Sequence, residues 1–288
     1  MVANQTSPSE ITGQFSQFLQ QQIDTQRYWR KSAMRGIDPQ ALHQVRVSLR
    51  QMRTIVSLFE PLLKSKWQQQ TLKRLRQMSR KLDTARDWDV YLEQHADRND
   101  QPNKALKRQR QKAQRQAKKA LNSRKWRSWL KSMQKQLRHG GGHRYFKQSL
   151  PLPSVNQFMK TLLEQRWAKV QKLMTAQVIA DDHKLHRLRI RCKQLRYATD
   201  FFTDHLPKRQ NEIFVEQLKQ LQQCLGDIHD AYIQQHLQQG LLLEAEQIIR
   251  QQQLISRSQQ LKQQLPGMFA GLESTAGHWR SESEPHFV

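Results

Sequence analysis

The sequence predicts an all-α protein whose two halves arose by duplication of one helical unit. Gly and Pro, which interrupt helices, number only 10 and 9 in a chain of 288 residues. Gln, Lys and Arg are abundant, and these residues favour helices. Alternating runs of β-branched and polar residues, the pattern typical of strands, are almost absent. A gap-free repeat at a shift of 143 residues, about half the chain, indicates the duplication.

The repeated segment keeps one histidine and three cations at a fixed spacing. Residues 42–53 read LHQVRVSLRQMR, and residues 185–196 read LHRLRIRCKQLR. The same shift carries Leu82 to Leu225 and Asp87 to Asp230. We call the four polar side chains of each copy a stripe: the first stripe is His43, Arg46, Arg50 and Arg53, and the second stripe is His186, Arg189, Lys193 and Arg196.

On a helix, each stripe occupies one narrow face. At 3.6 residues per turn, His43 and its three arginines fall within an arc of about 80°. The apolar Val45, Leu49 and Met52 lie beside this arc rather than opposite it. A solvated face points away from the core and mixes charge signs, whereas each stripe has one sign and borders the core. We therefore expect the stripes to line a groove, and a solubilising face is the alternative.

Caps and breakers delimit the helices of the first half. Gly36 ends the first helix, and Asp38 as N-cap with Pro39 at the first helical position begins the second, which carries the first stripe. Phe15, Phe18, Leu19 and Tyr28 are the candidate core positions of the first helix. The expected helices are residues 9–31, 39–63, 65–81, 84–97 and the basic pair 103–121 and 123–138, after which Gly140-Gly141-Gly142 breaks the chain.

The second half repeats this order and adds a long helix. Asp181 occupies the N-cap site before the second stripe, and Pro207 opens the next helix. We expect helices over residues 207–223, 227–239 and 241–264, with Pro266-Gly267 ending the regular structure and residues 268–288 weakly ordered. The expected division into repeats is 1–147 and 148–288.

The charge of the chain points to a polyanionic partner. The net charge is +25, and a charge of this size concerns partners rather than fold. Residues 101–163 hold 17 Lys or Arg and no acidic residue. Only two cysteines occur, which suits free thiols in a reducing cytoplasm. No apolar run approaches the ~18 residues needed to span a bilayer, and no signal-peptide core is present, so we expect a cytoplasmic protein without a membrane partner.

Arginine in the stripes indicates phosphate binding. Its planar guanidinium group donates two parallel hydrogen bonds to phosphate oxygens and keeps its positive charge at ordinary pH. Cations spaced about 5–6 Å apart along a helix suit a linear polymer of phosphates. Arg76 and Lys219, again 143 residues apart, add one cation from the next helix, whereas the basic character of Lys73, Arg74 and Arg80 is not repeated.

Signatures of enzymes and metal sites are missing. No phosphate-binding glycine loop, serine elbow or HExxH helix occurs, so we expect no catalytic residue and no cofactor. Arg46 and Arg189 stand three residues after the stripe histidines and repel a divalent cation, so no metal is expected. The imidazoles either donate to a phosphate oxygen or bond a backbone carbonyl. Asp87 and Asp230 are interpreted as ion-pair or cap residues, and Asp83 and Asp227 as corner residues.

The two motifs and the following Leu-x-x-x-Arg-Asp segment resemble the CHAD domain, the conserved histidine α-helical domain, over about residues 12–262. The resemblance implies two pseudosymmetric four-helix bundles that bind inorganic polyphosphate in a basic central cavity. By resemblance, the candidate ligands are His43, Arg46, Arg50, Arg53, Arg76, His186, Arg189, Lys193, Arg196 and Lys219. The sequence departs from symmetry at Asp83, where the second copy has Gly226, and at His229, which replaces Arg86. We expect these positions to leave the stripes intact.

Three functions are compatible with the sequence. The first is a stand-alone polyphosphate-binding protein, associated with polyphosphate granules and without enzymatic activity. The second is a general polyanion or nucleic-acid binder, which the charge supports but the absence of aromatic residues within the stripes disfavours. The third is a phosphotransfer enzyme, which needs clustered carboxylates for Mg²⁺.

Overall fold

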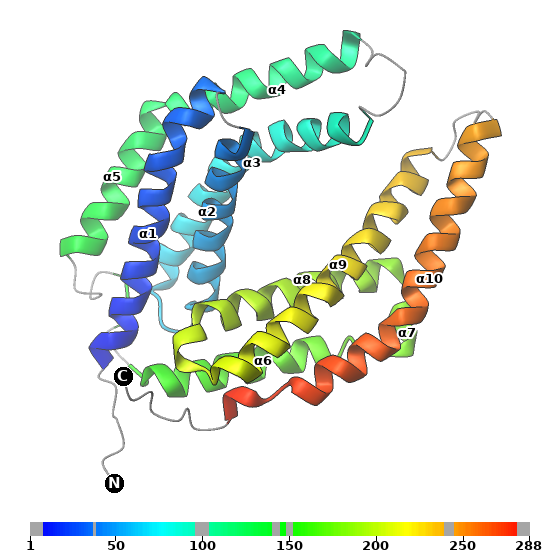
Figure 1. The fold of residues 1–288 in the computed structure, drawn as a ribbon. Helices are drawn as coiled ribbons and strands as arrows, with labels where there is room; N and C mark the ends of the chain where they lie inside the picture. Colours follow the sequence, from blue (N-terminus) through cyan, green and yellow to red (C-terminus); the bar gives the residue numbers. More distant parts are fainter. Residues whose placement is uncertain are drawn as a thin grey trace. The chain divides into compact units, whose positions relative to one another are not determined.

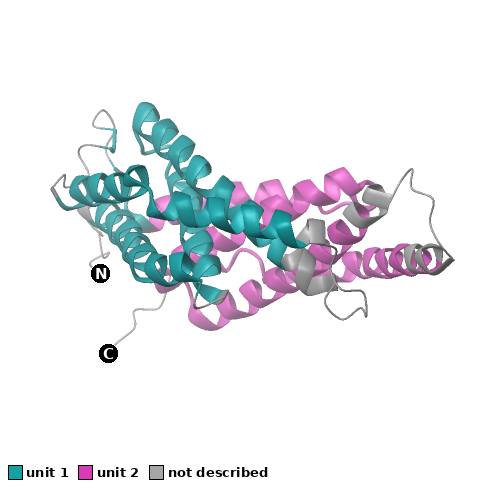
Figure 2. Ribbon diagram, turned by 90° about the horizontal axis from the view of Figure 1, so that it is seen from above, with its two compact units in different colours: residues 1–155 teal, residues 156–288 magenta. Residues whose placement is uncertain are grey.

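The computed structural model describes residues 8–36, 39–95, 104–139, 145–147, 152–238 and 245–280 (Figure 1). These residues form two compact units, residues 1–155 and 156–288 (Figure 2). The all-α prediction is confirmed, because the described ranges hold no strand and only one isolated bridge, between Leu63 and Phe146. No helix in these ranges is long and apolar enough to cross a membrane. The predicted repeats 1–147 and 148–288 stay a prediction.

Unit 1 contains α1 (Pro8–Arg35), α2 (Pro39–Leu58), α3 (Ser65–His95), α4 (Lys104–Asn122) and α5 (Arg124–His139). α1 packs on α2, α2 on α3 and α3 on α4, while α5 packs on α1 and α4. Val45, Leu49 and Met52 are fully buried and give α2 its core face. The rings of Phe15 and Phe59 meet at 4.7 Å between α1 and the end of α2. The predicted basic helices are α4 and α5, whose bounds agree with the prediction to within one residue.

Unit 2 contains α6 (Val155–Gln171), α7 (Ala176–Ile179), α8 (Asp182–Phe201), α9 (Lys208–Gln238) and α10 (Ala245–Thr275). α8 packs on α9, α9 packs on α10, and α7 contacts both α8 and α10. Asp181 caps α8 as predicted, because its Oδ1 accepts a hydrogen bond from the backbone N–H of Lys184 at 3.0 Å. Leu188, Cys192 and Leu195 form the fully buried face of α8.

The expected breaks within α3 and α9 are wrong, since each helix runs unbroken for 31 residues. Leu82 in α3 and Leu225 in α9 are buried and continue the apolar face through the expected corner. Gly226 costs α9 only about 1 kcal/mol of helix propensity, which core burial on either side outweighs. Asp87 and Asp230 therefore lie inside helices and are not caps.

α2 ends at Leu58 rather than at residue 63. Pro61 explains the early stop, because a proline lacks the N–H that helix pairing requires and disfavours helical backbone at the residue before it. Tyr28 was expected in the core of α1, but it is 75% exposed. At 100° per residue, Tyr28 lies about 180° away from Leu19 around the helix, and the buried face reaches Gln26 instead.

The chain remains ordered beyond Pro266, contrary to prediction. Pro266 lies inside α10, which continues to Thr275. Leu265 and Leu272 are fully buried on either side of it, so packing compensates for the backbone hydrogen bond that proline removes. Trp279, in the short helix η2 (His278–Arg280), is fully buried, and its indole N–H donates to Glu164 Oε1 at 2.8 Å. The predicted cap Asp38 and the predicted break at residues 140–142 lie outside the described residues.

Candidate anion-binding site

The two stripes occupy equivalent places on two helices of equal length. α2 and α8 each have 20 residues, and the stripe histidine is the fifth residue of its helix in both cases. The bounds of α3 and α9 also differ by the shift of 143 residues found in the sequence. These bounds agree with the proposed duplication, which itself stays a prediction. The core faces of α2 and α8 are buried, and the stripe side chains lie at the border of the core, half-buried or exposed.

In unit 1, the structure brings Arg76 of α3 to the stripe on α2. Burial lowers the pKa of Arg53, and so do the nearby charges of Arg76 and Arg50. Three arginines from two helices therefore lie close enough to repel one another. Such crowding is unfavourable without a bound anion, and it leaves a local positive potential that an anion neutralises.

Asp83 also faces the first stripe, which the sequence did not indicate. Arg46 Nε donates to Asp83 Oδ1 at 3.0 Å, and the Arg46 side chain is only 13% exposed. The expectation that Asp83 leaves the stripe intact is wrong, because α3 is continuous and presents this carboxylate to α2. The charge of Arg46 is thus partly neutralised within unit 1.

The second stripe has no carboxylate at this position. A Cβ placed on Gly226 lies 3.5 Å from Nε and Nη2 of Arg189, so the guanidinium rests against the bare backbone of α9. Arg189 Nε and His186 Nδ1 are buried and have no hydrogen-bond partner among the described residues. Buried donors and acceptors of this kind are normally satisfied, so these two unpaired atoms distinguish the second stripe from the first, where Arg46 Nε is paired with Asp83.

A second histidine lies against the second stripe. The rings of His186 on α8 and His229 on α9 have centroids 4.2 Å apart. Burial lowers the pKa of both imidazoles, and the charge of Arg189 lowers both further. His229 was expected to lie at a helix corner away from the stripe, and this expectation is wrong because α9 runs through that point.

Arg86 occupies the place of His229 in unit 1. Burial lowers the pKa of His43, as do the charges of Arg46 and Arg86. Sequence reasoning therefore missed one residue beside each stripe histidine, Arg86 in unit 1 and His229 in unit 2. The sequence does indicate that Arg86 and His229 occupy equivalent positions, because they are 143 residues apart. Only the continuity of α3 and α9 places them next to the histidines.

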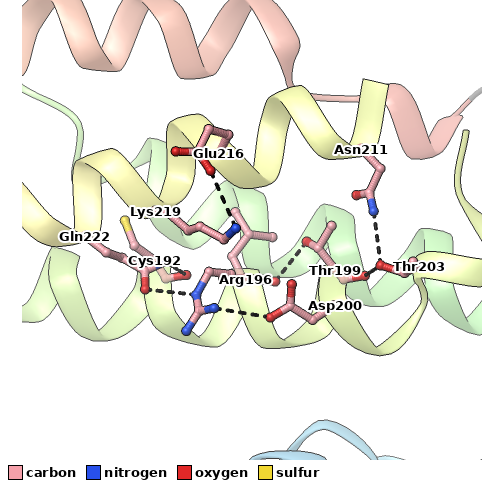
Figure 3. Close-up of polar contacts among 10 residues, drawn as sticks. Cys192, Arg196, Thr199, Asp200, Thr203, Asn211, Glu216, Lys219 and Gln222 are labelled. Atoms are coloured by element: carbon pink, nitrogen blue, oxygen red, sulfur yellow. Dashed lines mark hydrogen bonds and ion pairs between the residues drawn. The ribbon is translucent and has the colours of Figure 1, made fainter. Parts of the chain in front are cut away.

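The far end of the second stripe is held by neighbouring polar groups (Figure 3). Arg196 Nε donates to Gln222 Oε1 at 3.1 Å, and its Nη1 lies 3.4 Å from Asp200 Oδ2. Lys219 of α9 lies 3.5 Å from Glu216 Oε2, and the charges of Arg196 and Lys219 both act on Asp200. Arg196 and Lys219 thus lie near one carboxylate, as Arg53 and Arg76 lie near each other in unit 1.

The described residues do not contain a cluster of three or more His, Cys, Asp or Glu side chains that is arranged to hold a metal ion. Arg74, one of the unrepeated cations, turns toward α5, where its Nη2 donates to the carbonyl of Lys125 at 3.0 Å. What the stripes offer is a row of cationic and imidazole hydrogen-bond donors on one helix, with further groups from the neighbouring helix. Such a row suits anionic oxygens repeated along a linear ligand.

Comparison with known proteins identifies the family to which this chain belongs. The family model of the CHAD domain matches residues 17–239, and the chain therefore belongs to the CHAD domain family. A crystal structure of the CHAD domain from the plant Ricinus communis has a similar fold, with a TM-score of 0.69 and 22% identity over 95% of this chain and 94% of that chain. PptA from Streptomyces chartreusis has a TM-score of 0.60 and 11% identity over 94% and 99% of the two chains. No curated protein matches this chain.

Proposed function

We propose that this protein binds inorganic polyphosphate through the two stripes. The observation that carries the proposal is the equivalent placement of a histidine and three cations on α2 and α8. Arg76 on α3 and Lys219 on α9 each add a cation at the far end of their stripe. The membership of the chain in the CHAD domain family supports the same partner.

The stripes favour a flexible chain of phosphates over nucleic acid. Polyphosphate carries a charge on every unit and has no bases that need a stacking surface. The stripes themselves consist of guanidinium, ammonium and imidazole groups and contain no Phe, Tyr or Trp, although Tyr197 lies next to Arg196 and Tyr232 next to His229. Nucleic-acid sites usually combine cations with aromatic platforms.

The proposed role is binding without chemical turnover, in the cytoplasm and in association with polyphosphate granules. Incubation of the protein with long-chain polyphosphate, followed by electrophoresis of the polymer, should show an unchanged chain length. A fluorescent fusion should colocalise with polyphosphate granules. Shortening of the polymer by the purified protein would contradict the proposed role.

A competition assay tests the partner directly. Labelled long-chain polyphosphate is bound at fixed salt and displaced with unlabelled polyphosphate, RNA or DNA of equal total charge. We expect polyphosphate to displace the label at a much lower concentration than either nucleic acid. The affinity should fall steeply with salt, because each neutralised phosphate contributes roughly −0.7 to −0.9 to the log–log slope in nucleic acids. Equal competition by RNA would reduce the function to general polyanion binding.

A further inference from the structure

A groove between α3 and α5 in unit 1 combines features that the stripes lack. Its volume is about 290 Å³, and it is lined by two tryptophans, one arginine and several amide and hydroxyl side chains. Trp67 and Trp129 are both half-buried and supply indole rings from opposite walls. No part of this groove belongs to the first stripe, whose side chains project from α2.

Two hydrogen bonds join the walls at opposite ends of the groove. At one end, Trp67 Nε1 donates to Gln136 Oε1 at 2.9 Å. At the other end, Arg74 Nη2 donates to the backbone carbonyl of Lys125 at 3.0 Å. Residues 67 and 74 are seven positions apart on α3, which corresponds to about 10 Å at 1.5 Å per residue. These bonds fix the spacing of the two walls, and a length of about 10 Å is enough for one nucleobase and its sugar.

The floor of the slot is buried, and its rim is exposed and polar. Met133 and Thr71 are buried at the base, whereas Gln70 and Ser132 are exposed at the rim. Among the described residues, the ring of Trp129 has no aromatic neighbour and its N–H has no hydrogen-bond partner. A flat ring can therefore stack on this indole while the rim amides and hydroxyls bond its edge.

The charge around the slot has one sign. Residues 61–82, which include the α3 wall, contain no Asp or Glu, and neither do residues 101–163, which include α5. The described contacts of the Arg74 guanidinium use two of its donors, toward Lys125 and Gln77. The remaining donors and the exposed Lys125 and Arg124 can meet phosphates at that end of the slot.

From this geometry we propose that the α3–α5 groove binds single-stranded nucleic acid, with one base in the slot and its flanking phosphates at Arg74 and Lys125. A single strand alternates flat bases with anionic phosphates, and the groove offers indole rings beside cations in the same order. Inorganic polyphosphate has no ring to fill the slot, so this site is independent of the stripes and does not rest on polyphosphate binding.

Binding of three probes tests the site: a 12-nucleotide oligoadenylate, an abasic phosphodiester of the same length and charge, and AMP. The wild type should prefer the oligoadenylate over the abasic chain at least about fivefold, the lower end of what one stacked base contributes. Trp129→Ala should remove most of this preference, and Trp129→Phe should keep most of it. Polyphosphate affinity should be the same in all three proteins.

A second pair of variants keeps the test decisive if Trp129→Ala fails to fold. Gln70→Glu places a carboxylate on the exposed rim and should weaken oligoadenylate binding severalfold. Gln111→Glu makes the same change at an exposed glutamine on α4, beside Arg108 and Lys112, and should have a much smaller effect. Equal affinity of the wild type for the base-containing and abasic chains would overturn the proposal, as would equal weakening by the two glutamate variants. If AMP bound as tightly as the oligoadenylate, the ligand of the groove would be a mononucleotide rather than single-stranded nucleic acid.

Discussion

Arg46 and Asp83 form an ion pair at 3.0 Å in unit 1, whereas the corresponding Arg189 in unit 2 rests against Gly226. The stripes are alike in sequence, but carboxylates meet them at different points: Asp83 pairs with Arg46 near the histidine of the first stripe, and Asp200 lies beside Arg196 at the far end of the second. A ligand must compete with Asp83 for Arg46, while it meets Arg189 without such competition. We therefore expect Arg189 to contribute more to phosphate binding than Arg46.

Substitutions at positions 83 and 226 that give each unit the residue of the other should change the affinity for polyphosphate in opposite directions. Asp83→Gly releases Arg46 and should raise polyphosphate affinity by about two- to fivefold, the range of a partly exposed ion pair. Gly226→Asp places a carboxylate beside Arg189 and should lower affinity to a similar extent. Gly226→Asn is the uncharged control. Calorimetric titration with long-chain polyphosphate measures all of these variants. An unchanged affinity in Asp83→Gly would show that the charge of Arg46 does not contribute to ligand binding.

Charge reversal within either stripe should weaken binding and leave the fold intact. Arg50→Glu and Lys193→Glu each remove a charge-assisted contact of about 1.5–3 kcal/mol, so affinity should fall about tenfold or more. Lys119→Glu on the exposed face of α4 makes the same charge change away from the stripes and serves as the control. Helical circular dichroism should be the same in all variants. Equal losses in the control and the stripe variants would place the stripes on a solubilising face.

The contact between His186 and His229 predicts that affinity rises as the pH falls. In the free protein, burial and nearby cations hold both pKa values below the ordinary value of 6.5. A bound anion favours the protonated imidazoles and raises these pKa values, so binding takes up protons between the bound and free values. His229→Gln should flatten the pH profile, and His205→Gln is the control. A wild-type profile that is flat from pH 8 to pH 5.5 would contradict a ligand role for this pair.

The same lowered pKa values predict how the free protein responds to acid. A histidine whose pKa is lower in the folded state than in the unfolded state is protonated more readily after unfolding. The free energy of unfolding of the ligand-free protein should therefore decrease as the pH falls below about 6.5, and His186 and His229 contribute to this decrease. Thermal melts from pH 8 to pH 5 measure it. Polyphosphate should offset the loss, since it favours the protonated form.

Trp279 should be essential for the stability of unit 2. Its ring is fully buried and its N–H bonds Glu164, so Trp279→Ala should cost about 3–5 kcal/mol. Tyr28→Ala, at a position that is 75% exposed, should change stability by less than about 0.5 kcal/mol. Denaturant unfolding monitored by circular dichroism compares the two variants. Similar stabilities would show that the segment after α10 does not contribute to the core.

Removal of metal ions should leave polyphosphate binding unchanged. The arginines and the lysine of the stripes can bind phosphate directly, and their positive charges repel a divalent ion. We expect the same affinity before and after treatment with a chelator and exhaustive dialysis. Stoichiometric zinc in the purified protein, together with weaker binding after chelation, would contradict this expectation.

The sequence alone determined the all-α class, the basic helices α4 and α5, the cap at Asp181 and the composition of the two stripes. These features depend on contacts within a few residues. Helix propensity, capping and the 3.6-residue period act locally, so a linear pattern reveals them. The periodicity also placed Val45, Leu49 and Met52 in the core, because buried residues recur along one face of a helix.

The tertiary structure decided which side chains meet across helices. Pro266 and Gly226 are local signals for a break, but buried neighbours carry α10 and α9 through both positions. Once α3 and α9 are continuous, Asp83 meets Arg46 and His229 meets His186. The groove between Trp67 and Trp129 likewise needs two helices that are distant in the sequence. Packing free energy summed over a whole helix outweighs a local preference of about 1–3 kcal/mol, and for that reason the sequence pattern did not predict these contacts.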